Sequence, residues 1–241
     1  TDAEAIKSRF AAAASCYQKV SRWTDMEIKV LKDILSANDQ LAQGNRKLLD
    51  DKGVLALNLM STPGAGKTSL ILATIERLKD KVSIGVIEGD VSSSIDAERI
   101  SREGIPVLQI NTGGECHLDA VMIQRALGDM PLDDIDMLLI ENVGNLVCTA
   151  EFDTGAHRNV VIASIPEGDD KPLKYPLMFT VADVILLNKT DLLPYLRFDI
   201  DAYRKSVRGL NDKVEVFEVS CETGQGLEQW LSWIDSQLKR L

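Results

Sequence analysis

The sequence has few cysteines, and the four that it has are far apart: Cys16, Cys116, Cys148 and Cys221. Small secreted domains that depend on disulfide bonds carry many cysteines in a short chain. This chain of 241 residues is therefore not a disulfide framework. Reduced thiols suit a cytoplasmic protein, and we expect that location.

Two further absences limit the partners. No apolar run approaches the roughly 18 residues of a membrane-spanning helix, and charged residues such as Asp2 and Lys7 exclude a secretory signal at the start. Positive charge is outweighed, with 27 Lys and Arg against 37 Asp and Glu. The net charge of -10 repels nucleic-acid phosphates, although a local basic loop can still bind a nucleotide. We expect neither a membrane nor a nucleic-acid partner.

From residue 54 onward, short β-branched and apolar runs alternate with helical stretches. The predicted strands are Val54–Met60, Val82–Glu88, Val107–Ile110, Met137–Glu141, Val160–Ile165, Val184–Leu187 and Val214–Val219. Helices are expected after Gly66, Ser94, His117, Lys171, Asp199 and Gly226. Near-continuous apolar strands that alternate with helices predict an α/β fold, with a mainly parallel sheet flanked by helices on both faces. In such a sheet the binding residues lie at the carboxyl ends of the strands.

Residues 1–52 are predicted to form an N-terminal helical extension of a domain that spans residues 53–241. From about Ser15 to Asp51 there is no proline and a single glycine, and apolar residues recur at steps of three and four. These residues are Met26, Val30, Leu31, Ile34, Leu35 and Leu41. We expect this stripe to pack on the domain, and a partner-binding surface is the alternative.

A phosphate-binding loop is predicted between the first strand and the first helix of the domain. Residues 61–68 read Ser-Thr-Pro-Gly-Ala-Gly-Lys-Thr, which matches G-x-x-x-x-G-K-[ST] except that Ser61 replaces the first glycine. Backbone N–H groups of small residues wrap the phosphates, Lys67 supplies a positive charge, and Thr68 binds Mg²⁺. A glycine-rich turn is the alternative, and the strand–loop–helix order favours the phosphate loop. The expected nucleotide ligands here are Gly64, Ala65, Gly66, Lys67, Thr68 and Ser69.

A guanine-binding motif follows the sixth predicted strand. Asn188-Lys189-Thr190-Asp191 resembles the N-K-x-D element of GTPases. The Asp191 carboxylate would accept from the N1–H and amino groups of guanine, a donor pair that adenine lacks, while the Lys189 stem lies on the purine. A solvated turn is the alternative for four residues alone. After the last strand, Ser220 and Cys221 begin a stretch that resembles the S-A-x-T-G element behind the base, and Cys221 is expected to be buried.

Two predicted strands end in carboxylates, one in Glu88-Gly89-Asp90 and the other in Glu141-Asn142-Val143-Gly144. Carboxylates bind Mg²⁺ directly or through water. We expect Thr68, Asp90 and Glu141 to hold Mg²⁺, on strands that flank the phosphate-loop strand. The candidate catalytic residues are Lys67, Asp90 and Glu141, with Asp90 orienting the attacking water. The Gly144 N–H is expected near the γ-phosphate. A capping or surface carboxylate is the alternative for each acid.

A metal site is a further hypothesis. Cys116 and His117 are adjacent and follow the third predicted strand, and Cys148 lies seven residues after Glu141. A thiolate and an imidazole suit Zn²⁺ or Ni²⁺. The spacing alone does not bring Cys148 close, and a buried thiol at a helix start is the commoner explanation of a Cys-His pair. His157 lies in a polar stretch and is expected to be solvated rather than a ligand.

Together these motifs resemble the HypB family of hydrogenase nickel-incorporation GTPases, within the SIMIBI class of P-loop GTPases. The resemblance extends from about Met26 to Trp233. The segments that carry it are residues 64–68, 88–90, 112–119, 141–148, 170–176 and 188–195, which read GAGKT, EGD, TGGECHLD, ENVGNLVC, DKPLKYP and NKTDLLPY.

The resemblance implies a GTPase that binds GTP or GDP with Mg²⁺, hydrolyses GTP slowly and gates nickel delivery as a nucleotide-dependent homodimer. It implies that Cys116, His117 and Cys148 form a Ni²⁺ or Zn²⁺ site. It also implies two partners, a nickel-delivering zinc accessory protein and a hydrogenase large-subunit precursor. Some family members carry an N-terminal nickel motif rich in cysteine or histidine, but here Cys16 is the single cysteine before Cys116, and no histidine precedes His117. We therefore do not expect nickel storage at the N-terminus.

Two alternatives stay open and a third is disfavoured. A urease accessory GTPase shares the phosphate loop but typically has a Cys-Pro-His motif where this chain has Cys116-His117. A metal-binding scaffold would use GTP as a structural clamp, with negligible turnover. A nickel store is disfavoured because the sequence has no histidine-rich tract.

Overall fold

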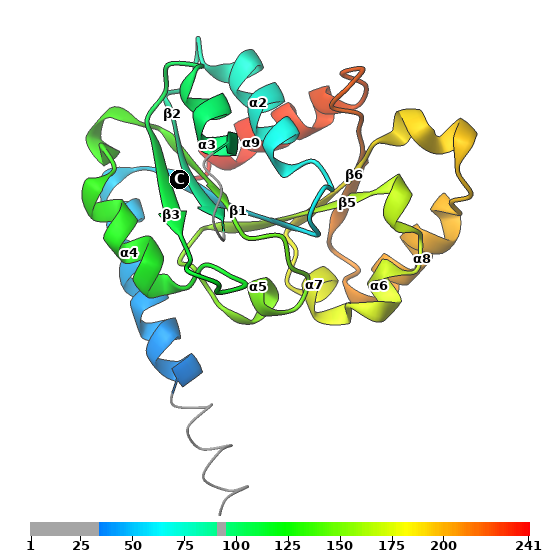
Figure 1. Cartoon of the computed structure of the whole chain (residues 1–241), viewed down its shortest axis with the longest axis horizontal. Helices are drawn as coiled ribbons and strands as arrows, with labels where there is room; N and C mark the ends of the chain where they lie inside the picture. The colour runs from blue at the N-terminus through cyan, green and yellow to red at the C-terminus, as the bar shows by residue number, and fades with distance from the viewer. Residues whose placement is uncertain (1–33, 91–94) are drawn as a thin grey trace, which may run out of the picture.

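The computed structural model describes residues 34–90 and 95–241. Its centre is a seven-stranded sheet in the order β3-β2-β4-β1-β5-β6-β7, with every neighbouring pair parallel (Figure 1). The strands are β1 Leu55–Ser61, β2 Ile84–Asp90, β3 Val107–Asn111, β4 Met137–Glu141, β5 Arg158–Ser164, β6 Val184–Asn188 and β7 Glu215–Glu218. The predicted parallel α/β fold is confirmed, and each strand lies within two residues of its expected bounds.

The position of β2 differs from the prediction. We expected both acid-bearing strands to flank β1, but β1 pairs with β4 and β5, and β2 pairs with the far side of β4. The prediction fails because sequence order does not set strand order in a sheet that is wound outward in both directions. Glu88 of β2 nevertheless lies opposite Glu141 of β4 in the register, so acids of both strands meet at one edge.

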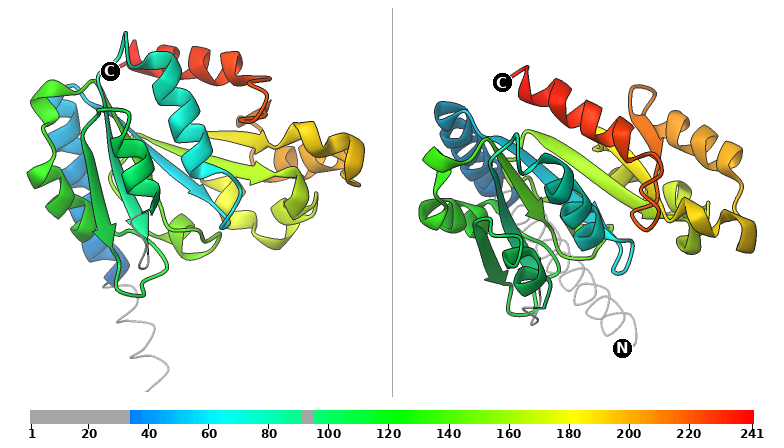
Figure 2. Two further views of the ribbon diagram at one scale, coloured as in Figure 1. Left: turned by 45° about the horizontal axis from the view of Figure 1, so that its top comes forward. Right: turned by 90° about the horizontal axis from the view of Figure 1, so that it is seen from above.

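Helices cover both faces of the sheet (Figure 1 and Figure 2). One face carries α2 Lys67–Leu78, α3 Ile95–Ser101 and α9 Leu227–Leu238. The other carries the N-terminal helix of residues 34–52, α4 Ala120–Asp129, α5 Cys148–Glu151, α6 Lys171–Lys174, α7 Pro176–Thr180 and α8 Ile200–Leu210. Short 3-10 helices span Leu132–Asp134, Ile165–Glu167 and Thr190–Tyr195. Within residues 34–90 and 95–241, no helix has both the length and the hydropathy that crossing a bilayer requires.

Alternate side chains of β1 pack into the cores on opposite faces of the sheet. Leu55, Leu57 and Leu59 belong to the core under α2 and α9, whereas Ala56 and Met60 pack with the helices of the opposite face. All five are buried, as expected of a strand that is covered on both faces. This packing holds the carboxyl edge of the sheet, where the functional loops emerge, in a fixed shape.

The N-terminal helix contacts the domain through a face that its apolar residues do not predict. Three residues of the predicted stripe, Met26, Val30 and Leu31, are outside the described residues. Ile34 is 51% exposed, and Leu35 and Leu41 are only half-buried. The buried face instead consists of Asn38, Ala42, Asn45 and Leu49. The predicted stripe is therefore wrong over the described part of the helix, because polar contacts to backbone groups replace aliphatic ones. The helix ends at the expected break, where Gly53 has a φ of 67°.

Candidate nucleotide and metal sites

The loops that follow β1, β2 and β4 enclose a cleft of about 490 Å³ at the carboxyl edge of the sheet. Most of the predicted phosphate and magnesium residues line it: Gly64, Gly66, Lys67, Thr68, Ser69, Asp90, Glu141 and Gly144. Ala65 is buried and does not line the cleft. Glu88, Asp96 and Arg99 also line it, and these three are not among the predicted ligands.

Ser61, the residue that departs from the phosphate-loop pattern, is buried and binds the lysine of the loop. The Nζ of Lys67 donates to the Ser61 hydroxyl at 3.1 Å. Burial lowers the pKa of Lys67, and the surrounding acids, Glu141 first among them, oppose the shift. The serine therefore anchors the lysine across the loop, which a glycine has no side chain to do.

Two glycines let neighbouring segments approach the phosphate loop closely. Gly66 has a φ of 107°, and a Cβ on it would lie against the Nδ2 of Asn188. A Cβ on Gly144 would lie 2.8 Å from the backbone nitrogen of Pro63. The base motif and the loop after β4 therefore pack directly on the phosphate loop, at distances that require glycine.

Two buried glutamates in the cleft each have one oxygen without a partner among the described residues. Thr68 donates to Glu141 Oε1 at 2.9 Å, while Glu141 Oε2 and Glu88 Oε2 have no hydrogen-bond partner within residues 34–90 and 95–241. Burial raises the pKa of Glu88 to about 8, and nearby Glu141 adds to the effect. Burial also raises the pKa of Glu141 to about 7, against the attraction of Lys67. Orphaned carboxylate oxygens beside a hydroxyl fit Mg²⁺, which prefers oxygen ligands.

Sequence reasoning missed three of the residues that line this cleft. Glu88 stands in the motif Glu88-Gly89-Asp90, so its signal is present, but its partnerless buried oxygen shows only in the fold. Asp96 and Arg99 lie on α3, and no local pattern connects them with the phosphate loop. The packing of α3 on the sheet, rather than sequence spacing, brings them there.

A second pocket of about 380 Å³ adjoins the phosphate loop and contains the predicted base-reading residues. It is lined by Gly66, Ser69, Asn188, Lys189, Asp191, Leu192, Cys221 and Glu222. Ser220 is buried and donates to Asp191 Oδ1 at 2.6 Å, which orients the carboxylate. Cys221 is half-buried rather than fully buried as predicted, and desolvation raises its pKa to about 11.

The base motif binds the backbone of the phosphate loop. Asn188 Nδ2 donates to the Ala65 carbonyl at 3.0 Å, and Lys189 Nζ donates to the Gly64 carbonyl at 2.6 Å. Lys189 has a φ of 63°, and it alone among the described non-glycine residues has a positive φ. Such strained backbone persists where the surroundings over-determine it, and it clusters at ligand sites. The two motifs therefore form one rigid unit.

The three predicted metal ligands come together from two loops. Cys116 and His117 follow β3, Cys148 begins α5, and their donor atoms all lie within 4.8 Å of one another. The two Sγ atoms are 2.9 Å apart, and Cys116 Sγ is 3.9 Å from His117 Nδ1. The hydrogen bond with Cys116 and burial raise the pKa of Cys148 to about 11, so a bound metal has to displace a thiol proton. Two sulfurs and an imidazole suit Ni²⁺ or Zn²⁺, and metal binding itself stays a prediction.

Phe152 holds the imidazole of this cluster. Its ring stacks on that of His117, with centroids 3.9 Å apart and planes 27° from parallel. Phe152 lies four residues after Cys148, and nothing in that spacing indicates the contact. The stack limits the orientations that the imidazole can adopt toward the two thiols.

One buried asparagine joins the metal loop to the nucleotide cleft. Asn142, which follows β4, accepts from the backbone N–H groups of Leu118 and Val143 at 3.0 Å and 2.9 Å. Leu118 directly follows His117 and packs on β2 so closely that a Cβ on Gly89 would lie 2.7 Å from it. Leu118, beside a predicted metal ligand, therefore contacts β2 and the loop that follows β4.

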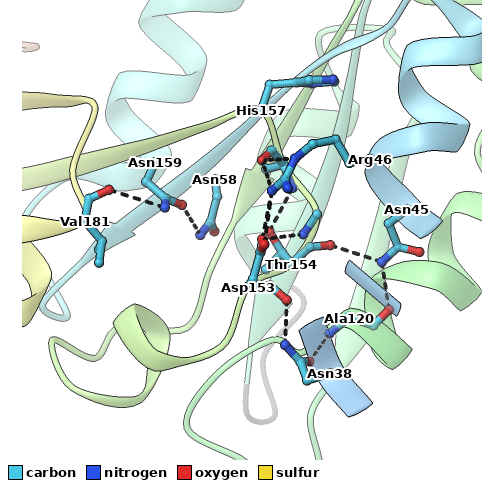
Figure 3. A network of polar contacts seen from close by, with 12 residues as sticks. Asn38, Asn45, Arg46, Asn58, Ala120, Asp153, Thr154, His157, Asn159 and Val181 are labelled. Atoms are coloured by element: carbon cyan, nitrogen blue, oxygen red, sulfur yellow. Dashed lines mark hydrogen bonds and ion pairs between the residues drawn. The ribbon is translucent and has the colours of Figure 1, made fainter. Parts of the chain in front are cut away.

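The prediction for His157 is wrong. Its side chain is only 9% exposed, its Nδ1 accepts from the Ala56 N–H at 2.9 Å, and its Nε2 lies 3.0 Å from Asp50 Oδ1. Asp153, which is near it in sequence, binds Arg46 of the N-terminal helix, as Figure 3 shows. His157 does not belong to the cluster of Cys116, His117 and Cys148.

Comparison with known proteins places the chain in a family. A family model described as the CobW/HypB/UreG nucleotide-binding domain matches residues 55–218. The hydrogenase maturation factor HypB of Escherichia coli strain K12 is 49% identical over 212 residues, which cover 88% of this chain and 72% of that relative. The chain belongs to the HypB family. The predicted HypB resemblance is thereby confirmed, as is a P-loop nucleotide-binding domain.

Two further members of the HypB family resemble the chain over nearly their whole length. The probable hydrogenase maturation factor HypB of Methanocaldococcus jannaschii is 44% identical over 214 residues, which cover 89% of this chain and 97% of that relative. A crystal structure of HypB from Helicobacter pylori in complex with nickel has a TM-score of 0.81 and 34% identity, covering 85% of this chain and 96% of that chain. The fold described above is therefore that of the HypB family.

Proposed function

We propose that this chain is a GTP-dependent metallochaperone that gates the delivery of nickel during hydrogenase maturation. The observation that carries the proposal is the meeting of two thiols and an imidazole within 4.8 Å, in contact with the nucleotide cleft through Asn142. The names of the relatives support it, since they are hydrogenase maturation factors and one is in complex with nickel. Zn²⁺ is a second cargo that the same donors accept.

The proposed nucleotide is GTP, which the chain hydrolyses slowly to GDP and phosphate. Asp191, oriented by Ser220, would accept from guanine, and Lys67 would donate to the β- and γ-phosphates. Asp90 would orient the water that attacks the γ-phosphorus. Thr68, Asp90 and Glu141, with Glu88 as a further oxygen donor, would hold Mg²⁺, which neutralises charge on the phosphates when bound.

The proposed gate couples the γ-phosphate to the metal ligands. Gly144 lies against the phosphate loop, and its N–H would bind the γ-phosphate only before hydrolysis. Asn142, two residues earlier, holds the N–H of Leu118 beside His117, while Cys148 lies four residues later than Gly144. A shift of this loop would move both halves of the metal cluster. By linkage, metal then changes nucleotide affinity by the same factor.

The proposed assembly is a nucleotide-dependent homodimer. Exposed apolar side chains that a second copy would cover are Leu173, Leu177, Tyr195 and Leu196, on α6, α7 and the loop after β6. The proposed partners are a nickel-delivering zinc accessory protein and a hydrogenase large-subunit precursor, in the cytoplasm. The division into residues 1–52 and 53–241 also stays a prediction.

One experiment tests the gate. Ni²⁺ and Zn²⁺ are titrated into the protein with Mg²⁺ and either GDP or a non-hydrolysable GTP analogue, and molecular mass is measured by light scattering on the same samples. We expect metal affinity to differ between the two nucleotides by a factor of about 5–150, with a dimer in the analogue. Equal affinity and equal mass in both would refute gating. Phosphate release under single-turnover conditions separates a GTPase from a GTP-clamped scaffold.

A further inference from the structure

The N-terminal helix contacts the domain through two buried asparagines, Asn38 and Asn45, which are 6% and 1% exposed. They lie seven residues apart, about two helical turns, and so project from one face. A helix that covers a sheet normally presents aliphatic side chains at such positions. A buried amide without partners would cost about 1–3 kcal/mol, so its hydrogen bonds decide whether it is tolerated there.

Both asparagines bind backbone groups of the same two segments (Figure 3). Asn38 accepts from the Ala120 N–H at 2.9 Å and donates to the Asp153 carbonyl at 2.9 Å. Asn45 donates to the carbonyls of Ala120 at 2.9 Å and Thr154 at 3.1 Å. Each amide therefore joins the first residue of α4 to the segment that follows α5. We call Asn38 and Asn45 the asparagine clamp.

Two further contacts tighten this junction. Arg46 donates to both carboxylate oxygens of Asp153 at 3.1 Å and to the Ala156 carbonyl at 2.9 Å. Gly155 has a φ of 90°, and a Cβ on it would lie 2.6 Å from the Ala42 carbonyl oxygen of the helix. The helix and the segment after α5 therefore touch at backbone distance, which leaves little freedom for either to shift alone.

The two clamped segments carry the metal cluster. Ala120 lies three residues after His117, and Asp153 directly follows Phe152, whose ring stacks on the His117 imidazole. Cys148 lies on the same segment as Phe152, at the start of α5. A displacement of either segment would change the separation of thiols and imidazole, which now fall within 4.8 Å.

We propose that the asparagine clamp positions the metal cluster, so that Asn38 and Asn45 set nickel affinity without contacting the metal. The inference rests on the proposed role of Cys116, His117 and Cys148 as metal ligands. The backbone groups that face Asn38 and Asn45 include both an N–H and carbonyls. An amide is a short neutral side chain that offers donor and acceptor together. A leucine would bury as much surface but would fix neither segment.

The test compares the unaltered chain with Asn45→Leu and Asn38→Leu, which keep the size of the side chain and remove its hydrogen bonds. Gly44→Ala is the matched control, because Gly44 is exposed on the same helix and a Cβ there meets no atom of the described residues within 4 Å. Ni²⁺ affinity is measured against a competing chelator, and coordination by the nickel–thiolate absorption bands. GDP affinity is measured by calorimetry, and folding by urea denaturation.

We expect each leucine variant to bind Ni²⁺ about ten- to hundredfold more weakly with altered nickel–thiolate bands, while GDP affinity stays within about twofold. The control should match the unaltered chain in Ni²⁺ and GDP affinity, and its free energy of unfolding should rise by about 0.5–1 kcal/mol, as expected of alanine in place of glycine inside a helix. Unchanged Ni²⁺ affinity in a folded variant would overturn the proposal, and so would equal losses of Ni²⁺ and GDP affinity, which indicate a general structural role. If Asn45→Leu does not fold, the less buried Asn38→Leu decides.

The metal assignment has its own control. Cys116→Ala is titrated beside the asparagine variants under the same conditions. If it binds Ni²⁺ as tightly as the unaltered chain, the proposed metal site is wrong, and the asparagine clamp has no cluster to position. If Cys116→Ala loses Ni²⁺ while both leucine variants keep it, the metal site stands and only the role of the clamp is refuted.

Discussion

The nucleotide cleft and the metal cluster are neighbours that the fold supports in different ways. In the cleft, the base motif after β6 binds the backbone of the phosphate loop after β1, as Asn188 binds the Ala65 carbonyl. In the metal cluster, Cys116 and Cys148 contact each other, and Asn142 of one loop binds the N–H of Leu118 in the other. The N-terminal helix adds hydrogen bonds to both segments. The cleft is therefore held by its own residues, whereas the cluster also draws support from outside its two loops.

This difference has a functional consequence. A cluster that is held from outside can be loosened without loss of the nucleotide. If the two regions are built in this way, substitutions will disable one and spare the other, and coupling will run through the few contacts between them, such as that of Asn142 with Leu118.

The largest expected effect is on metal binding alone. Cys116→Ala removes one of three donors, and we expect Ni²⁺ affinity to fall by more than the roughly hundredfold that loss of an outer partner costs. GDP affinity should not change, since Cys116 does not line the cleft. Nickel titration and GDP calorimetry on one preparation measure both. Cys221→Ala, which removes a thiol outside the cluster, is the control, and nickel binding should survive it.

The next largest effect is expected on nucleotide binding, with metal binding kept. Gly66→Ala forces a side chain into a φ of 107° and against Asn188, so we expect GDP affinity to fall by about a hundredfold while Ni²⁺ affinity stays. Gly209→Ala is the control, because that glycine of α8 has open space beside it. Calorimetry measures the nucleotide and a chelator competition the metal. A parallel loss of affinity for GDP and Ni²⁺ would contradict the separate support of the two regions.

A smaller effect is expected inside the base pocket. Asp191→Asn removes the carboxylate that would accept from guanine, and we expect GTP affinity to fall by about 10–100-fold while xanthine nucleotide gains affinity. Glu222→Gln changes a carboxylate in the lining of the same pocket and is the control. Competition binding with GTP, ATP and xanthosine triphosphate measures the result. Unaltered GTP affinity would remove Asp191 from base recognition.

The same contrast explains what the sequence could predict. The phosphate loop and the base motif are short contiguous patterns that follow strands, and a parallel sheet brings the carboxyl ends of its strands to one edge. Apolar runs locate those strands, so the sequence alone is enough to place Lys67, Thr68, Glu141 and Asp191 at that edge. Side-chain anchors such as Ser61, which binds Lys67, add detail that the pattern does not contain.

Features that depend on contacts between segments far apart in the sequence could not be predicted from local patterns. The order of β2 and β4 follows from winding, which periodicity does not encode. The helix face with Asn38 and Asn45 was missed because hydrophobic patterns count aliphatic residues, whereas here amides bind backbone groups. The approach of Cys148 to Cys116, 32 residues apart, came from the family resemblance rather than from spacing.

The smallest expected effect is on stability, and it comes from Glu88 in the nucleotide cleft. Its pKa of about 8, against an ordinary value of 4.5, means that the folded chain binds this proton more tightly than the unfolded chain does. The stability that it contributes is full below about pH 4.5 and is lost as the pH rises toward 8. We expect Glu88→Gln to raise the free energy of unfolding of the ligand-free protein at pH 8 by about 1–2 kcal/mol, after allowance for screening, and to change it little at pH 4.5.

Urea denaturation at pH 4.5, 6.5 and 8 measures this difference in the free energy of unfolding. The control is the exposed Glu228→Gln, which removes a carboxylate from the first turn of α9 and should not raise the free energy of unfolding at any of these pH values. Adding Mg²⁺ and GDP should reduce the difference in the free energy of unfolding between Glu88→Gln and the unaltered chain at pH 8. A bound cation stabilises the buried Glu88 carboxylate, which the variant lacks. An effect of Glu88→Gln that is equal at all pH values would show that charge is not the cause. In that case the orphaned oxygen of Glu88 would reflect local packing, and the magnesium assignment would rest on Thr68, Asp90 and Glu141.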